Sequence, residues 1–205
     1  MIHIADYGMG NIASIQNMLK KVGAQSVITN EPKKILEAEK IILPGVGAFD
    51  TAMKRLNENG WAEALNKKVI EKKTIVLGVC LGVQLMCNQS EEGVEKGLGW
   101  VDADVVRFNP ENAKEQIRIP HMGWNSVQQQ KDISLLKMNE EDRFYFVHSY
   151  HLENVPLEFV WARTHYGYDF VSGIQHGNIY GVQFHPEKSH RYGMELYKNF
   201  AALNS

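Results

Sequence analysis

The sequence predicts an α/β fold in which helices cover a largely parallel sheet. Short runs of β-branched residues alternate with stretches of helical periodicity through the first half of the 205-residue chain. Hydrophobic residues make up 44% of the chain, which is enough for a sizeable core. No Pro/Ser/Gly-rich linker or internal repeat interrupts the pattern. Because strand–helix alternation places successive strands parallel, we expect one α/β domain over residues 1–205.

The expected elements follow in order. In the first half, strands are expected at 2–5, 26–29, 40–43 and 74–79. Helices are expected from residue 11 to about 22, where Ile12, Ile15 and Leu19 recur at helical spacing, and at 48–57, 61–72 and 81–88. Later strand-like runs should join the same sheet or pack beside it. They are 103–108, 143–150, 158–164 and 179–184, followed by a helix at about 193–203.

Composition and charge exclude several classes of function. The net charge is -2 and no dense Lys/Arg run occurs, so nothing favours binding to nucleic acid or to a membrane surface. No apolar run approaches the ~20 residues that span a bilayer, and the N-terminus lacks the pattern of a signal peptide. Two cysteines cannot form a disulfide scaffold, which indicates a reducing compartment. We therefore expect a cytoplasmic protein.

The segment "GVCLG" at 78–82 places Cys80 between two glycines where a strand turns into a helix. This is the nucleophile-elbow pattern G-x-S-x-G with cysteine in the position of serine. Such a turn lifts the central side chain clear of the sheet, puts it at a helix N-terminus that favours thiolate, and lets the Leu81 N–H point at a developing oxyanion. The alternative is a buried cysteine filling a gap, which is how we interpret Cys87, two helical turns away and too distant for a disulfide.

A thiol nucleophile needs a base and a group that orients the base. His185 and Glu187 flank Pro186 after a strand-like run. Residues two apart in extended chain face the same way, and proline stiffens that geometry. Glu187 can therefore hold one ring nitrogen of His185 while the other faces Cys80. Taken alone, the segment is more typical of a His and a Glu in a surface turn, and only together with the elbow does it favour a triad.

"GVCLGVQL" at 78–85, followed by "GVQFHPEKS" at 181–189, resembles the class I (triad-type) glutamine amidotransferases. "DYGMGN", "LPGVGAF", "PHMGWN" and "YFVHSY" resemble, in the same order, the glutaminase subunits of imidazole glycerol phosphate synthase. The resemblance implies a three-layer fold with a mixed, mostly parallel sheet, and a catalytic triad of Cys80, His185 and Glu187. It implies hydrolysis of L-glutamine through a thioester, without a cofactor. The ammonia passes to a separate (β/α)₈-barrel synthase subunit, which forms imidazole glycerol phosphate in histidine biosynthesis.

The same resemblance assigns further residues. The oxyanion hole is expected from the backbone N–H groups of Val46 and Leu81, in a loop that the barrel subunit is expected to rearrange. Substrate-binding positions are Gly47, Gln84, His148, Ser149 and Tyr150. Partner-facing positions are Asn11, His121, Trp124, Asn125, Tyr145 and Lys188. Plainer alternatives are an ordinary Pro-Gly turn at Val46, a solvent-facing Gln84 and a core Trp124. His148 and His151 lack a third ligand at a suitable spacing, so we expect no metal site.

The sequence allows three other interpretations. Residues 8–13 match G-x-G-x-x-A with Glu31 about twenty residues on, which is typical of dinucleotide binding, but this leaves the elbow and the His-Pro-Glu segment unexplained. A family member without catalysis would not need an intact triad. Finally, "GLGWVDADVVRF", "YFVHSYHLE" and "EKSHRYGMEL" depart from the commonest histidine-pathway pattern and resemble a paralogous branch that supplies ammonia to a sugar amidotransferase in surface-glycan biosynthesis.

Overall fold

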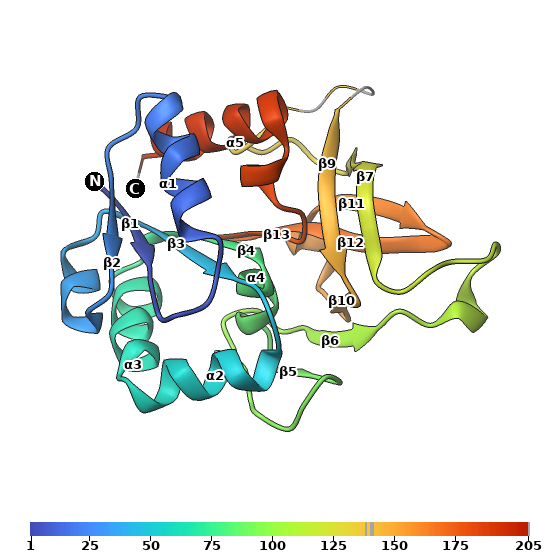
Figure 1. Ribbon diagram of the computed structural model, residues 1–205, viewed down its shortest axis with the longest axis horizontal. Helices are drawn as coiled ribbons and strands as arrows, with labels where there is room; N and C mark the ends of the chain where they lie inside the picture. Colours follow the sequence, from blue (N-terminus) through green and yellow to red (C-terminus); the bar gives the residue numbers. More distant parts are fainter. Residues whose placement is uncertain (138, 140–141, 205) are drawn as a thin grey trace.

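A twisted mixed sheet forms the centre of the computed structural model, which describes residues 1–137, 139 and 142–204 (Figure 1). Its first five strands are parallel neighbours in the order β2-β1-β3-β4-β13. They are β1 (Ile2–Ala5), β2 (Ser26–Thr29), β3 (Lys40–Gly45), β4 (Ile75–Cys80) and β13 (Ile179–Val182). β3 and β4 are buried almost throughout, as expected of strands covered on both faces.

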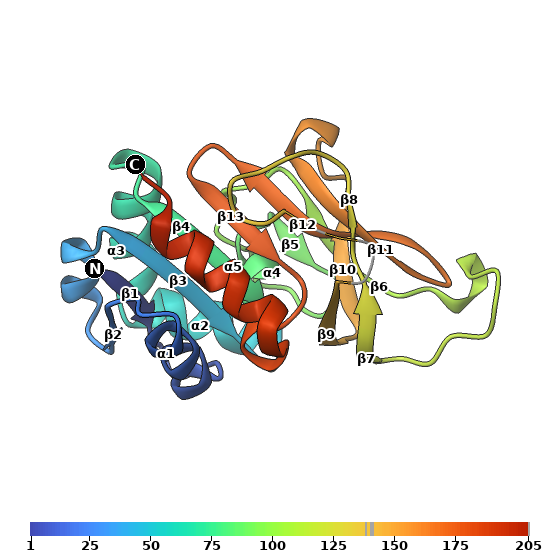
Figure 2. The same ribbon diagram turned by 90° about the horizontal axis from the view of Figure 1, so that it is seen from above.

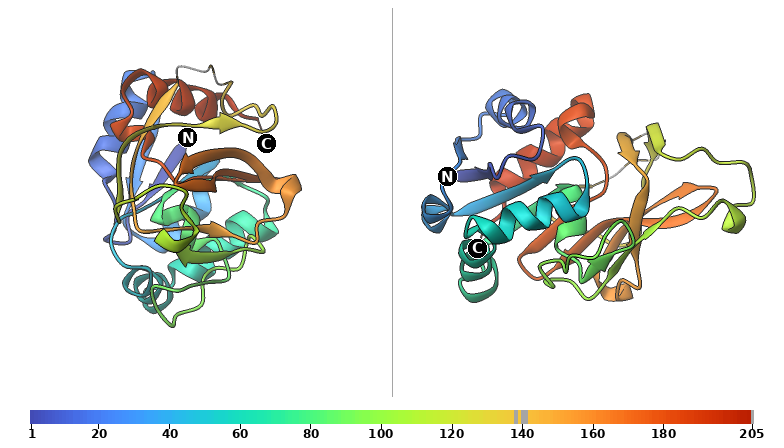
Figure 3. Two further views of the ribbon diagram at one scale, coloured as in Figure 1. Left: turned by 90° about the vertical axis from the view of Figure 1, so that its right-hand side faces the viewer. Right: turned by 60° about the horizontal axis from the view of Figure 1, so that its bottom comes forward.

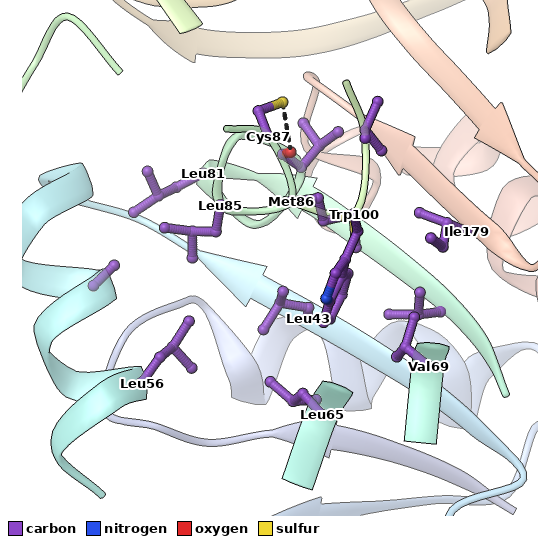
Figure 4. Packing of buried hydrophobic residues seen from close by; sticks show 14 of the residues in the cluster. Leu43, Leu56, Leu65, Val69, Leu81, Leu85, Met86, Cys87, Trp100 and Ile179 are labelled. Atoms are coloured by element: carbon purple, nitrogen blue, oxygen red, sulfur yellow. Dashed lines mark hydrogen bonds between the residues drawn. The ribbon is translucent and has the colours of Figure 1, made fainter. Parts of the chain in front are cut away.

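Helices cover both faces of this parallel part. α1 (Ile12–Lys21) and α5 (His190–Ala202) lie on one side, as Figures 1 and 2 show. α2 (Phe49–Glu58) and α3 (Trp61–Asn66) lie on the other. Figure 4 shows the core on the α2/α3 side, where Leu43 from β3 faces Leu56 and Leu65. The expected three-layer α/β architecture is confirmed.

The sheet continues beyond β13 with mainly antiparallel strands in the order β12-β10-β6-β5. These are β12 (Tyr168–His176), β10 (Tyr150–Glu153), β6 (Asp104–Arg107) and β5 (Gln89–Ser90), while β11 (Val160–Tyr166) pairs with β12 and β8 (Gln128–Gln129). β7 (His121–Ser126) and β9 (Arg143–His148) form a separate two-stranded ribbon. The connection between β6 and β7 extends past the end of the sheet (Figure 3). The later strands thus both join the sheet and pack beside it, as predicted.

Two predicted helices end earlier than expected. The helix expected at 61–72 changes at Asn66 into a π turn, Lys67–Glu71. The helix expected at 81–88 is α4 (Leu81–Leu85), only five residues long. It stops because a later segment takes its last carbonyl groups: Leu98 N–H donates to Leu85 O and Trp100 N–H to Met86 O, both at 2.8 Å. The dipole of so short a helix contributes little to stabilising a thiolate at Cys80.

The remaining short helical elements are 3₁₀ turns. They are Pro32–Glu37, Pro110–Asn112, Leu157–Phe159 and Pro186–Lys188. None of the helices in the described ranges is long and apolar enough to cross a bilayer. Cys87 is fully buried on the α2/α3 side, where its Sγ lies 3.6 Å from the carbonyl oxygen of Val83 (Figure 4), as expected of a core residue.

Candidate active site

Three adjacent parallel strands bring the predicted chemistry to one edge of the sheet. β3, β4 and β13 are neighbours, and their carboxyl ends lead directly into Val46, Cys80 and the segment that carries His185. Gly45 and Cys80 are paired across β3 and β4, so the two loops that follow these strands start side by side. Ligand sites in α/β sheets form at such carboxyl ends.

The elbow at Cys80 is a strained turn that depends on its two glycines. Cys80 has φ 54° and ψ -112°, a backbone conformation that residues other than glycine rarely adopt. A Cβ at position 82 would lie 1.9 Å from the carbonyl oxygen of Leu43, and one at position 78 would lie 2.8 Å from the backbone nitrogen of Val83. The glycines therefore allow the turn to pack directly on β3 and α4. Strain of this kind is typical of functional positions.

His185 and Glu187 form a buried pair next to the elbow. His185 Nδ1 lies 2.8 Å from Glu187 Oε1, and both side chains are 1% exposed. The pair is held from behind, because Ser189 Oγ donates to the carbonyl oxygen of His185 while the backbone N–H of Tyr145 donates to Ser189 Oγ. A carboxylate at Nδ1 fixes the proton on that nitrogen. Nε2 has no hydrogen-bond partner among the described residues, which leaves this ring atom free to exchange a proton with the sulfur or the substrate.

The charges at the site favour a protonated His185. Burial lowers the pKa of His185, but the Cys80 sulfur and the Glu187 carboxylate outweigh burial and raise it to about 10. At neutral pH the ring therefore carries a proton beside the sulfur. An imidazolium next to a cysteine can stabilise the thiolate and later give its proton to a leaving group.

A cavity of about 610 Å³ opens over Cys80 and His185. Cys80 and His185 line it together with every predicted oxyanion and substrate-binding residue: Val46, Leu81, Gly47, Gln84, His148, Ser149 and Tyr150. Asn11 and Lys188, predicted to face a partner, also line it. Sequence reasoning missed four lining residues: Gly10, Glu92, Pro120 and Val147. Glu92 lies in an acidic run at 91–92 that gave no motif to recognise.

Gln84 is held by the protein and does not face solvent. Its Nε2 donates to Tyr150 O at 3.1 Å and to Gln183 Oε1 at 3.0 Å. Gln183 is a further residue that sequence reasoning missed, although it lies within the "GVQFHPEKS" segment. Its own Nε2 is 3.8 Å from the Cys80 sulfur.

The ribbon formed by β7 and β9 presents an exposed aromatic strip beside the cavity. Met122 and Trp124 alternate outward along β7 and are 61% and 44% exposed. The Trp124 ring is 6.2 Å from that of Tyr145 in a T-shaped arrangement, and Lys188 Nζ lies 5.6 Å from the Tyr145 ring centroid. Met122, Trp124, Tyr145 and Lys188 are hereafter the exposed strip. His121 and Asn125 alternate to the other face of β7, and His121 is buried there.

The glycines of the dinucleotide-like segment have packing contacts. Arg55 Nη1 donates to Gly8 O at 2.5 Å, and a Cβ at Gly10 would lie 2.9 Å from Pro44 Cβ. Glu31, the expected ribose ligand of that pattern, pairs with Lys34 at 2.6 Å. These contacts account for the segment without a bound nucleotide.

Comparison with known proteins identifies the family. Residues 3–203 match the family model described as "Glutamine amidotransferase class-I". The chain is similar to "Imidazole glycerol phosphate synthase subunit HisH 2" of Pseudomonas aeruginosa, 47% identical over 99% of this chain and 100% of that one. It is 49% identical to a protein of the same name from Methanococcus maripaludis over 98% of each chain.

Among solved structures, the fold resembles that of the glutaminase domain of CTPS from Trypanosoma brucei. The TM-score is 0.65 at 17% identity, covering 98% of this chain and 92% of that one. The match over residues 3–203 and the full-length relatives lead to one conclusion: the chain belongs to the class I glutamine amidotransferase family.

Proposed function

We propose that this protein is the glutaminase subunit of an imidazole glycerol phosphate synthase. It hydrolyses glutamine at Cys80 and delivers the ammonia to a (β/α)₈-barrel synthase subunit in a heterodimer. The observation that carries this proposal is the buried His185–Glu187 pair, with Nδ1 and Oε1 2.8 Å apart. His185 lines the same cavity as Cys80, which stands on a strained elbow. Relatives of nearly the same length bear the name of this subunit.

The residues of the cavity support thioester chemistry in two steps. The Cys80 sulfur attacks the side-chain amide carbon of glutamine, and the carbonyl electrons move to oxygen. His185 then protonates the nitrogen, the C–N bond breaks and ammonia leaves, which produces a glutamyl thioester. In the second step neutral His185 takes a proton from water, hydroxide displaces the sulfur, and glutamate leaves.

The synthase itself gives the direct test of the proposed function. The purified protein is mixed with a barrel synthase subunit in the presence of its ribulose-linked aminoimidazole precursor, and glutamate and imidazole glycerol phosphate are measured. We expect the two products in equal amounts when glutamine is the nitrogen source. Glutamate release without synthesis of imidazole glycerol phosphate would contradict the proposed acceptor but not the glutaminase.

The oxyanion hole suggests how the partner controls this activity. Val46 lies between Gly45 and Gly47, which has φ 99°, so its peptide is free to reorient beside Leu81. Loss of one oxyanion donor lowers kcat by ~10²–10³. We therefore expect the isolated protein to hydrolyse glutamine slowly, and addition of the barrel subunit with its substrate to raise glutamate release by about 10²–10³-fold. A lone subunit that is fully active would contradict this gating.

The exposed strip is the proposed docking face for the barrel, because it borders the cavity from which ammonia must leave. Asn11 lines the cavity, whereas His121 and Asn125 lie on the opposite face of β7, where His121 is buried. Trp124→Ala should weaken the stimulation by the barrel subunit. Leu157→Ala removes an apolar side chain that is even more exposed, 77% against 44%, but lies elsewhere, and it should leave the stimulation unchanged.

Glu92 is a candidate ligand for the α-ammonium group of glutamine. Its Oε2 accepts from the backbone N–H of Phe49 at 2.9 Å, which fixes the carboxylate at the wall of the cavity. A hydrogen bond to a charged group contributes about 1.5–3 kcal/mol, so Glu92→Gln should raise the KM for glutamine by roughly tenfold or more. We expect a smaller change in kcat. Glu95→Gln, which removes a charge from the same segment outside the cavity lining, is the matched control; equal effects of the two variants would contradict the assignment.

A sugar amidotransferase partner is the second candidate acceptor. The departures at 97–108, 145–153 and 187–196 favour it. Complementation separates the two acceptors. Growth of a histidine auxotroph that lacks its glutaminase subunit supports the histidine pathway. Failure to restore growth, with glutaminase activity intact in extracts, supports the second candidate.

A further inference from the structure

The Gln183 side chain lies between the nucleophile and the substrate-binding residues, where the triad mechanism gives it no role. Gln183 follows β13 directly, its backbone N–H donates to Ser172 O at 3.0 Å, and the residue is 1% exposed. Its Nε2 is 3.8 Å from the Cys80 sulfur and its Oε1 accepts from Gln84 Nε2 at 3.0 Å. A buried amide needs partners at both ends, and here one of those partners is the reacting atom.

The hydrogen-bond chain itself fixes which end of the amide faces the sulfur. The carbonyl oxygen of Tyr150 can only accept, so the Gln84 group that approaches it at 3.1 Å must be the NH₂. The other hydrogen of that NH₂ is directed at Gln183, which must therefore present its oxygen to Gln84. The Gln183 NH₂ is then left to face Cys80. A flipped amide would place two oxygens or two NH₂ groups against each other.

Two histidines form a second chain, which ends on the same acceptor, the carbonyl oxygen of Tyr150. His148 Nδ1 lies 2.7 Å from Tyr150 O and must donate, so its Nε2 accepts from His121 Nδ1 at 3.0 Å. His121 Nε2 in turn accepts from the amide NH₂ of Asn125 at 3.2 Å. This arrangement requires both rings to be neutral. Burial lowers the pKa of His121 to about 4 and that of His148 well below its ordinary value, so the chain keeps its direction at physiological pH.

We propose that Gln183 is a further catalytic residue, whose carboxamide NH₂ donates a hydrogen bond to the Cys80 sulfur and stabilises the thiolate that attacks glutamine. The carbonyl oxygen of Val147 lies 3.9 Å from the sulfur and can accept from the neutral thiol. It offers nothing to the thiolate, whereas the Gln183 NH₂ and the positive charge of protonated His185 favour ionisation. When the sulfur becomes a neutral thioester, the Gln183 bond weakens, so the residue acts mainly on the nucleophile.

Two substitutions separate this role from a purely structural one. Gln183→Glu keeps the oxygen that holds Gln84 but turns a carboxylate oxygen toward the sulfur. Gln183→Met removes both the oxygen that holds Gln84 and the NH₂ that faces the sulfur, while the side chain keeps a similar size. Both are made in a Cys87→Ala background, so that Cys80 is the only cysteine. Gln175→Met is the matched control. Gln175 lies on the neighbouring strand β12, and the substitution removes a glutamine amide whose Nε2 donates to Tyr180 OH at 3.2 Å.

The measurement is the pH dependence of Cys80 alkylation by iodoacetamide. We expect the pH of half-maximal rate to rise by about one to two units in Gln183→Met, as for loss of a charge-assisted hydrogen bond, and further in Gln183→Glu. Gln175→Met should match the parent. An unchanged midpoint in both Gln183 variants, with the thermal unfolding midpoint retained, would overturn the proposal. So would a Gln183→Glu variant that behaves like the parent while Gln183→Met is impaired, because Gln183 would then only anchor Gln84.

This inference rests on Cys80 being the nucleophile of the proposed function, but the two fail in different ways. Alkylation needs neither glutamine nor the barrel subunit. A Cys80 that alkylates in the parent only at the high pH of an ordinary thiol would contradict the proposed nucleophile itself. A parent with a reactive Cys80, whose midpoint does not respond to Gln183, would contradict the role of Gln183 alone.

Discussion

Replacing Cys80 by alanine should abolish glutamine-dependent synthesis by the complex, lowering its rate by about 10⁴-fold or more. Alanine has no nucleophile, and the described residues that line the cavity include no second thiol. Cys80→Ser should be nearly as inactive, since a hydroxyl beside His185 does not ionise as a thiol does. Synthesis driven by added ammonium salt should continue unchanged, because that step belongs to the barrel subunit. Glutamate and imidazole glycerol phosphate are measured separately with each nitrogen source.

Cys87→Ala is the matched control for this prediction. Cys87 is fully buried, and burial together with the Asp104 charge raises the pKa of its thiol, so it is an inert core residue. Its loss should lower the thermal unfolding midpoint while leaving both nitrogen sources usable. Retention of glutamine hydrolysis by Cys80→Ala would refute the thioester mechanism. Loss of ammonia-dependent synthesis would instead show that the variant disturbs the barrel subunit.

The parallel half of the fold could be predicted because its signals are local. β1 and β2 have the bounds expected from the sequence, and β3 and β4 lie within two residues of theirs. Each is a short β-branched run next to a helix of clear periodicity, so no distant partner is needed to recognise it. The elbow is equally local, since its glycines and the cysteine occupy five consecutive positions.

The second half was harder to predict, because distant contacts determine its strands. The segment of β7 reads "HMGWNS", which includes a glycine and an asparagine and has little strand propensity. It is extended because it pairs with β9 and because the His121 ring stacks on Tyr166 with centroids 4.0 Å apart. β12 was missed for a similar reason: Gly173 interrupts its apolar pattern, and a Cβ there would lie 2.4 Å from the Trp161 ring.

The same contrast separates the site residues that were predicted from those that were not. Cys80, His185 and Glu187 stand in motifs whose residue types already suggest their chemistry. Gln183 and Glu92 carry ordinary polar side chains, and their roles depend on partners far away in the chain. Gln84 lies 99 residues before Gln183, and Phe49 lies 43 residues before Glu92. A single sequence contains no signal for such pairs.

Replacing Glu187 by glutamine should lower glutamine hydrolysis by about 10³–10⁴-fold without displacing Cys80, as expected for loss of the carboxylate of a triad. The carboxylate holds the proton on Nδ1 of His185, so that Nε2 faces the sulfur. A glutamine is neutral and can turn its NH₂ toward Nδ1, which selects the wrong tautomer. It also removes one of the negative charges that stabilise protonated His185 beside the thiolate.

The pH profile of this variant gives a sharper test than the rate alone. The Cys80 sulfur and Glu187 together raise the pKa of His185 to about 10, so the imidazolium that protonates departing ammonia is lost only as the pH rises through that value. Removing the Glu187 charge lowers this pKa, and the alkaline limb of kcat should therefore move to lower pH. Glu195→Gln, which removes an exposed charge from α5, should leave the limb in place. If the limb of Glu187→Gln coincides with that of the parent, Glu187 does not control His185, and the triad assignment is wrong.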